Sequence, residues 1–325
     1  MSIQKRYALL TIALCLVFAM LCTGCSLVSS VFHPAKEEEQ PVDSTAGFRQ
    51  TVLYFETDDG LMVPVMKLLP WEEGIGRAAL NQLVDTDDNR ISAAAMGLKN
   101  VVPQGVSFVL SISDDAVATL NICDLPKLEN AAAEQAMVTA VVNTLTEFPT
   151  IDKVQLKFDG KIKKKLPHGT NVQDAMRSIP LNEEPLPVSA TDQDAQYQLT
   201  LFYPNQSASL FVPVTRHILQ EPDLAVAMRE LMMGPVDANL LNCFPEGTEV
   251  LSAEILDDVA TVNLSPAFSA IKDSPEMEDA ALQCIQLTAQ QFGTISSVKV
   301  EVDGKLLKSD VLETMALPAF VNEYR

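Results

Sequence analysis

The feature that most limits how this chain can fold is an internal repeat. Three pairs of segments match. DDAVATLNI (114–122) matches DDVATVNLS (257–265) at an offset of 259 − 117 = 142 residues, and FPTIDKVQLKFDGK (148–161) matches FGTISSVKVEVDGK (292–305) at 303 − 159 = 144. TVLYF (51–55) matches TLFYP (200–204) at 213 − 64 = 149. Two copies are too few for a repeat array that shares its core between neighbours. Each copy is long enough to bury a core of its own. We therefore expect two independent domains at 49–175 and 198–325, joined by a linker at 176–197.

The two copies predict the same order of elements, ββαββαβ. Two strand-like runs come first, followed by a helix whose apolar residues recur at helical spacing: Ala79, Leu80, Leu83 and Val84 in the first copy, and Leu224, Ala227, Met228, Leu231 and Met232 in the second. The first copy has DTDDN (85–89) where Gly-Pro ends this helix in the second copy. A hairpin, a long helix and a last strand that ends in Asp-Gly complete each copy. This order is typical of an α+β fold, so we expect two tandem two-layer domains with mostly antiparallel sheets.

The acidic pairs of the repeat, Asp114–Asp115 and Asp257–Asp258, allow two interpretations. Aspartate tolerates turn geometry and can hydrogen-bond to its own backbone, which favours a hairpin turn. The alternative is a pair of catalytic carboxylates. A tight exposed turn offers none of the burial that separates the pKa values of such a pair, so we interpret both pairs as turns.

A proline lies inside the second predicted strand of each copy, at Pro64 and Pro213. Proline cannot donate a hydrogen bond to a neighbouring strand, so these strands are expected at a sheet edge or a bulge. A partner can extend an edge by adding a strand, which makes the regions around Pro64 and Pro213 a candidate interaction edge. The alternative is that these prolines prevent such pairing.

The first 24 residues have the pattern of a secretory signal segment. Two basic residues precede an apolar run at 7–21, which is shorter than the roughly 20 residues of a membrane-spanning helix. The run ends in LCTGC, which resembles the bacterial lipobox, although Cys22 stands where that pattern prefers leucine. The resemblance implies that Cys25 is lipidated and that the protein is anchored to the extracytoplasmic face of the cell membrane, with 25–48 as a flexible tether. An uncleaved N-terminal anchor is the alternative.

Cysteines and charge limit the remaining chemistry. Cys123, Cys243 and Cys284 have no cysteine at the matching positions of the other copy, so we interpret them as small buried residues and leave a Cys243–Cys284 bridge open. The formal net charge of −20 disfavours nucleic acid and anionic headgroups as partners and leaves the membrane link to lipid. Lysines at 161–165 are explained by protection of an edge strand against aggregation. A docking point for an acidic partner is the alternative.

No catalytic, cofactor-binding or metal-binding motif is found in the sequence. The three histidines, His33, His168 and His217, have no partner at metal-binding spacing and do not recur between the copies. The Walker, G-x-G-x-x-G, G-x-S-x-G and H-E-x-x-H patterns are missing. We therefore expect no catalytic residues, no cofactor, no metal and no enzymatic activity.

Several segments, taken in their order, resemble the GerMN domain: VVNTLTEFPTIDKVQLKFDGK (141–161), ELMMGP (230–235), PEGT (245–248) and VATVNLSPAF (259–268). This domain occurs in tandem in a lipoprotein family of endospore-forming bacteria. The resemblance implies a fold similar to the ring-building motif and a role in sporulation and germination. It also implies partners among the envelope proteins that assemble a channel between mother cell and forespore.

Three classes of function remain. The first is a membrane-anchored scaffold or assembly factor in sporulation and spore germination that acts by protein–protein contacts. The alternative is a cell-wall-binding or sensory lipoprotein that works with a membrane kinase. The third, an enzyme that acts on the cell wall, needs a cluster of titratable residues in a cleft, and the sequence displays none.

Overall fold

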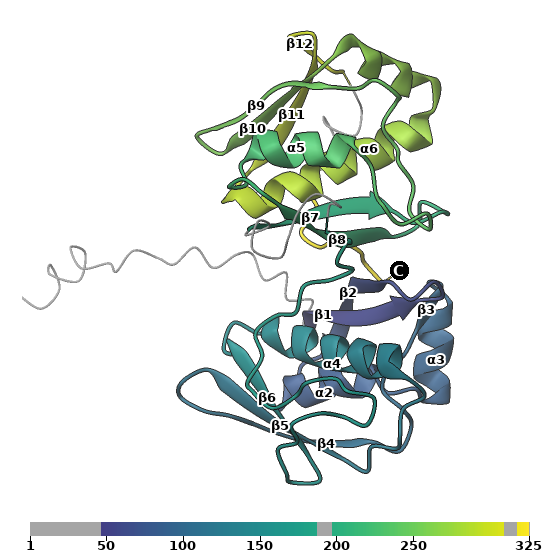
Figure 1. Cartoon of the computed structure of the whole chain (residues 1–325), viewed down its shortest axis with the longest axis vertical. Helices are drawn as coiled ribbons and strands as arrows, with labels where there is room; N and C mark the ends of the chain where they lie inside the picture. The colour runs from purple at the N-terminus through teal and green to yellow at the C-terminus, as the bar shows by residue number, and fades with distance from the viewer. Residues whose placement is uncertain (1–46, 187–196, 309–316, 325) are drawn as a thin grey trace, which may run out of the picture. The chain divides into compact units, whose positions relative to one another are not determined.

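The structure, a computed structural model, describes residues 47–186, 197–308 and 317–324. Residues Gly47–Arg325 group into one compact unit that contains both copies of the repeat (Figure 1). The expectation of two independent domains at 49–175 and 198–325 stays a prediction. The predicted signal segment, Cys25 and nearly all of the tether lie outside the described residues.

The first copy has the predicted order of elements with one insertion. Its elements are β1 (Phe48–Thr57), β2 (Met62–Pro70), α2 (Ile75–Gln82), α3 (Asp87–Ala94), β3 (Leu98–Lys99), β4 (Ser107–Ile112), β5 (Val117–Cys123), α4 (Ala131–Thr146) and β6 (Lys153–Phe158). The insertion is α3 with the short strand β3. Helix α3 begins inside DTDDN because Thr86 Oγ1 accepts a hydrogen bond from Asn89 N at 3.3 Å and two aspartates occupy the first turn.

The second copy follows the predicted order with two added 3-10 helices and a short last strand, β12. Its elements are β7 (Tyr197–Pro204), β8 (Phe211–Ile218), α5 (Leu224–Met232), β9 (Val250–Leu256), β10 (Val259–Leu264), η1 (Pro266–Asp273), α6 (Pro275–Ala289), η2 (Gln290–Phe292), β11 (Ser297–Val302) and β12 (Lys305–Leu306). Helix α5 starts where Asp223 Oδ1 accepts a hydrogen bond from Val226 N at 2.7 Å. It ends before Gly234, as its sequence pattern predicts.

The strands of each copy form two small sheets with helices between them (Figure 1). The strand orders are β2-β1-β3 and β4-β5-β6 in the first copy, and β7-β8 and β12-β11-β10-β9 in the second. Pairing is antiparallel except for β5 with β6 and β10 with β11. The two strands of each of these pairs are parallel because a helix, α4 or α6, connects the end of the first strand to the start of the second. The predicted α+β class with mostly antiparallel sheets is confirmed.

Helix α4 shows how the helical layer is held between two sheets. Eleven of its residues are buried, far more than the single apolar stripe of a surface helix. It contacts β1 in one sheet and β6 in the other. Val138, Val141 and Leu145 recur at helical spacing and are all buried, and Phe148 is buried just beyond the helix.

The asparagine of the repeated segment VAT-x-N supports the turn that ends each copy. Both residues of each turn, Asp159–Gly160 and Asp303–Gly304, have positive φ, between 50° and 78°. A type I′ turn requires this left-handed pair, and Asp-Gly adopts it at low cost. Asn121 Oδ1 accepts a hydrogen bond from Gly160 N at 2.7 Å, and Asn263 Oδ1 accepts one from Gly304 N at 3.0 Å. The acidic pairs also lie at hairpin turns, as predicted.

Candidate functional site

The strands that contain proline, β2 from the first copy and β8 from the second, contact each other. Each is the outermost strand of its sheet, as expected for a strand interrupted by proline. Pro64 and Pro213 both line the cavity at this junction. The junction therefore brings together the two segments that the sequence singled out.

Asn182 joins the two strands from the segment that follows the first copy. Its Oδ1 accepts a hydrogen bond from Met62 N at 2.8 Å and its Nδ2 donates to Met62 O at 2.8 Å. The same Nδ2 donates to Pro213 O at 2.7 Å. One side chain therefore ties β2 of the first copy to β8 of the second.

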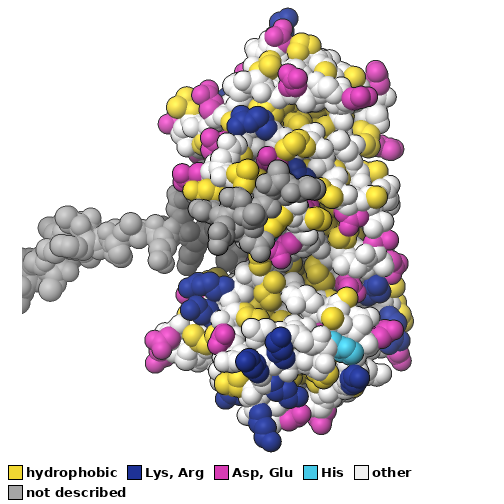
Figure 2. Space-filling view, viewed as in Figure 1, with side chains coloured by type: hydrophobic (Ala, Val, Ile, Leu, Met, Phe, Trp, Pro, Cys, Tyr) yellow, Lys and Arg dark blue, Asp and Glu magenta, His cyan; other side chains and the backbone are white. Residues whose placement is uncertain are grey.

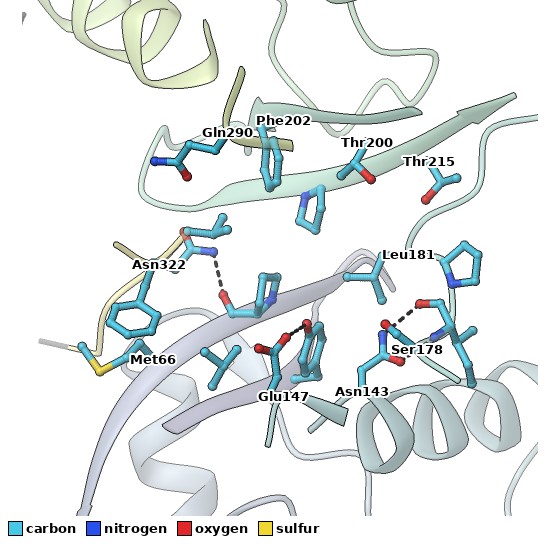
Figure 3. Close-up of a pocket in the computed structure, with 18 of the residues that line it drawn as sticks. Met66, Asn143, Glu147, Ser178, Leu181, Thr200, Phe202, Thr215, Gln290 and Asn322 are labelled. Carbon is cyan, nitrogen blue, oxygen red and sulfur yellow. Dashed lines mark hydrogen bonds between the residues drawn. The ribbon is translucent and has the colours of Figure 1, made fainter. Parts of the chain in front are cut away.

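Asn322 makes the same three contacts with the copies exchanged. Its Oδ1 accepts a hydrogen bond from Phe211 N at 2.8 Å and its Nδ2 donates to Phe211 O at 2.9 Å. The Nδ2 also donates to Pro64 O at 2.9 Å, a bond that Figure 3 draws. Asn322 is 7% exposed, so loss of its side chain leaves these backbone groups with little access to water.

The backbone next to each asparagine extends the sheet of the other copy. Glu183 forms a parallel bridge with Thr215 of β8, and Glu323 forms one with Met66 of β2. The amide of the following residue donates to Thr215 O at 2.9 Å in one case and to Met66 O at 2.9 Å in the other. Each copy therefore sends a segment that lies beyond its last strand across to the edge strand of the other copy.

These contacts repeat at constant offsets, which indicates a pseudo-twofold exchange. The strand residues match at 211 − 62 = 149, 213 − 64 = 149 and 215 − 66 = 149, and the asparagines at 322 − 182 = 140. In a symmetric homodimer, residue i of one subunit contacts j of the other and j contacts i. The same relation holds here within one chain. We call the two segments 182–184 and 322–324, with the strands β2 and β8 that they bind, the reciprocal clamp.

A cavity of about 420 Å³ adjoins the reciprocal clamp, lined by β1 and β2 on one side and β7 and β8 on the other (Figure 3). Tyr54 Oη donates a hydrogen bond to Glu147 Oε1 at 2.5 Å in its wall. Burial, and then the charge and hydrogen bond of Glu147, raise the pKa of Tyr54 well above its ordinary value of 10.0. Tyr54 therefore stays protonated at neutral pH and acts as a hydrogen-bond donor.

A buried ion pair fixes the first clamp segment on the second copy. Arg216 Nε donates to Glu184 Oε2 at 2.6 Å and Arg216 Nη2 donates to Glu184 Oε1 at 3.1 Å. Burial lowers the pKa of Arg216, but the hydrogen bond to Glu184 and nearby negative charge raise it above its ordinary value. Removing one partner of such a buried pair typically costs about 3–5 kcal/mol of stability, because the other charge is left unpaired.

The edges expected to bind a partner around Pro64 and Pro213 already have partners within the chain. The clamp segments supply backbone hydrogen bonds to Met66 and Thr215, and the carbonyls of both prolines accept hydrogen bonds from asparagine side chains. Strand addition needs backbone groups that are free, and these groups are occupied within the chain, so binding of a partner at Pro64 or Pro213 stays a prediction.

The cysteines named in the sequence have different positions. Cys25 lies outside the described residues, so its lipidation stays a prediction. Cys243 and Cys284 are buried free thiols whose Sγ atoms lie 3.8 Å apart, and Cys123 is half-buried. Burial, and then the hydrogen bond between Cys284 and Cys243, raise the pKa of the Cys284 thiol.

The described residues show no arrangement that resembles a metal site. Within 47–186, 197–308 and 317–324, no group of three or more His, Cys, Asp or Glu side chains could hold a metal ion. His168 Nε2 lies 2.9 Å from Leu128 O, and His217 Nε2 lies 3.1 Å from Glu183 Oε1. In that same part of the chain, no helix has both the length and the apolar character needed to cross a membrane.

The reciprocal clamp was missed by the sequence analysis, although a faint signal exists. Leu-Asn-Glu (181–183) and Val-Asn-Glu (321–323) share the dipeptide Asn-Glu. Both lie beyond the segments whose match defines the repeat. A shared dipeptide is too short to stand out without knowledge that both asparagines bind the same strand positions.

Comparison with known proteins identifies relatives over most of the chain. The profile of the Germane family, described as sporulation and spore germination, matches residues 52–164 and 200–308. The spore germination protein GerM of Bacillus subtilis (strain 168) is 28% identical over 334 aligned positions, which cover 90% of each chain. The solved structure of the tandem GerMN domains of the sporulation protein GerM from Bacillus subtilis has a TM-score of 0.69 at 27% identity. It covers 85% of this chain and 99% of that one.

Proposed function

Because the chain belongs to the Germane family of sporulation and spore germination proteins, we propose that it is a non-enzymatic scaffold or assembly factor in that process. The observation that carries this proposal is the reciprocal clamp. It joins both copies into one unit by hydrogen bonds from Asn182 and Asn322 to strands of the opposite copy. A joined unit holds two similar surfaces in a fixed relation, which is what a scaffold requires.

The contact surfaces in this proposal are the outermost strands β4 and β9, one from each copy. Among the described residues, each pairs with a neighbouring strand on one side only. Apolar side chains are exposed on both strands: Val109 and Ile112 on β4, and Leu251 and Leu256 on β9. A free edge with exposed apolar side chains can be extended by a strand from a partner. We expect these partners to be envelope proteins of a sporulation complex, arranged as a ring or channel.

The anchor in this proposal is lipid on Cys25, which holds the protein on the extracytoplasmic face of the cell membrane. The support is the LCTGC segment after an apolar run of 15 residues at 7–21. A single acyl chain binds a membrane only weakly and reversibly, whereas a cysteine that carries two acyl chains anchors a protein stably. The Cys25→Ala variant is expected to leave the membrane fraction, and mass spectrometry of the mature N-terminus gives an independent check.

A deletion strain tests the function itself. We expect fewer heat-resistant spores, or spores that germinate slowly, with normal vegetative growth, and recovery when the wild-type gene is returned. Returning the Cys25→Ala gene separates the anchor from the folded unit. Normal sporulation and germination in the deletion strain would contradict the proposal. Hydrolysis of purified peptidoglycan by the protein would contradict its non-enzymatic part separately.

The cavity beside the clamp supports a second candidate, a sensory or wall-binding lipoprotein. Its volume of about 420 Å³ falls within the range of small-molecule sites, roughly 300–1,000 Å³. A soluble cell-wall fragment bound there would protect the junction and raise the midpoint of thermal unfolding. No shift with any wall fragment, together with a sporulation defect in the deletion strain, leaves the scaffold as the supported function.

A further inference from the structure

A lysine-rich stretch in the first copy has no role in the proposed scaffold. Residues 153–165 hold six lysines and one aspartate, a local charge of 6 − 1 = +5 in a chain of net charge −20. The matching residues 297–309 of the second copy hold three lysines and two acids, 3 − 2 = +1. Both stretches form the same strand and the same Asp-Gly turn. The fold therefore does not require the additional lysines.

The six lysines belong to one region of the surface, which we call the lysine face: Lys153, Lys157, Lys161, Lys163, Lys164 and Lys165. The first two share a face of β6, because side chains four positions apart on a strand point the same way. The other four are exposed in the segment after β6. Figure 2 shows dark blue side chains gathered over the region of β5, β6 and the segment that follows.

The backbone that carries the lysine face is held in place. Phe158 N donates to Lys161 O at 2.8 Å, and Val172 N donates to Lys164 O at 3.2 Å. Lys163 Nζ lies 5.3 Å from the centroid of the Phe158 ring. Further along, the buried carboxylate of Glu134 accepts a hydrogen bond from His168 N at 2.8 Å. The lysines are therefore presented from an ordered segment.

Protection of an edge strand does not explain these lysines. The outer side of β6 is already occupied, because Val154 N donates to Met176 O at 2.8 Å and Met176 N donates to Val154 O at 2.9 Å. Within the described residues, none of the six lysines takes part in a salt bridge. The one acid in the stretch, Asp159, accepts a hydrogen bond from Asp124 N at 3.1 Å. The positive charges are thus available to an external anion.

We propose that the lysine face docks on a bilayer surface of anionic phospholipids and so turns the first copy toward the membrane. This inference rests on the proposed membrane location. A lysine ammonium is a point charge suited to phosphate, and each lysine near an anionic bilayer adds attraction. The predicted tether at 25–48 spans at most about 80 Å when extended, enough to allow contact.

The net charge of −20 does not prevent this contact. At physiological ionic strength, charges separated by more than about 8 Å are largely screened from each other. A local cluster of lysines therefore acts on a bilayer largely independently of acids elsewhere on the chain. This proposal differs from the expectation that the net charge disfavours anionic headgroups as partners, because the net charge averages over an uneven surface.

Vesicle co-sedimentation tests the proposal with the chain that begins at Ser26. This chain keeps the whole compact unit, which starts at Gly47, and has no residue to acylate at position 25. We expect it to sediment with vesicles of one part phosphatidylglycerol to two parts phosphatidylcholine, and not with phosphatidylcholine alone. Binding should weaken as salt rises. The K161E/K163E/K164E variant should bind at least about tenfold more weakly, because three attractive charges are reversed.

A matched control separates the lysine face from net charge. The K299E/K305E/K308E variant changes the net charge by the same amount at exposed lysines of the second copy. It should bind as wild type does, with circular dichroism showing that all three proteins are folded. Equal loss of binding in both variants, or no binding by the wild-type chain, overturns the proposal. Capture of an acidic soluble protein in place of vesicles also overturns it. A sporulation defect in the deletion strain stays interpretable in every case, because it is measured separately.

Discussion

At the scale of single residues, two asparagines hold the junction because an amide side chain can accept and donate at once. Asn182 forms hydrogen bonds with both the backbone N–H and the backbone C=O of Met62, and Asn322 does the same with Phe211. Each uses its amide nitrogen a second time on a proline carbonyl in the other copy. An aspartate has the same shape but cannot donate, so the substitution separates hydrogen bonding from packing.

We predict that Asn322→Asp lowers the free energy of unfolding by about 2–4 kcal/mol, because two carbonyls lose their donor and face a carboxylate. Asn182→Asp should have a similar effect, since its contacts are equivalent. Urea denaturation followed by circular dichroism measures both. Asn239→Asp, at an exposed position, is the control and should change stability little. A loss at position 322 no larger than that of the control would contradict the clamp.

The thiols give a second prediction at this scale. Cys243 and Cys284 are buried, so a reagent should not reach either of them in the folded protein. Burial also raises the pKa of the Cys284 thiol, which keeps that thiol protonated. In the chain from Ser26, a thiol reagent should modify Cys123 first, and all three cysteines only after unfolding. Peptide mapping by mass spectrometry identifies the sites. Rapid native modification of Cys284, or a Cys243–Cys284 disulfide in protein purified from cells, would show this description to be wrong.

At the scale of elements, the sequence predicted what local patterns control. Helix α5 was predictable because Pro222 and the Gly234–Pro235 pair mark its ends. Strand β6 was predictable because polar and apolar residues alternate in its sequence, and its side chains alternate in burial in the same way. Helix α3 could have been recognised from Thr86 and the acids after it, which are typical of a helix start. The clamp segments were not predictable, since they extend sheets of the opposite copy. The cavity was not predictable for the same reason.

The open edges lead to a prediction about elements. Ile112 on β4 is 49% exposed and Leu256 on β9 is 72% exposed. We expect Ile112→Lys and Leu256→Lys to weaken capture of envelope proteins from sporulating cells, because a charge at an edge opposes strand addition. Each should change stability by less than about 0.5 kcal/mol, as is usual at exposed positions. Leu219→Lys, also exposed, is the control. Unchanged capture by a variant that carries both Ile112→Lys and Leu256→Lys would exclude these edges as the contact surface.

At the scale of the whole molecule, the two copies resemble a symmetric dimer whose subunits have been joined in one chain. In each case a segment beyond the last strand of one copy pairs with the edge strand of the other, through Glu183 and Glu323. In this exchange the edges of β2 and β8, which contain the two prolines, face the junction between the copies. The strands β4 and β9 remain outermost in their own sheets. The scaffold proposal depends on this joining, because two freely moving domains would not hold their surfaces in a fixed relation.

Cutting the chain between the copies tests whether the reciprocal clamp alone holds them together. A protease site placed between residues 186 and 197 allows the chain to be cut there while both clamp segments stay intact. If the clamp holds the copies together, the cut protein should elute from a size-exclusion column as one particle, with the mass of the uncut chain by light scattering. The same cut in the Asn182→Asp/Asn322→Asp variant should release two pieces. If the cut wild-type protein separates into two folded halves under native conditions, the two copies are independent domains and the account is wrong.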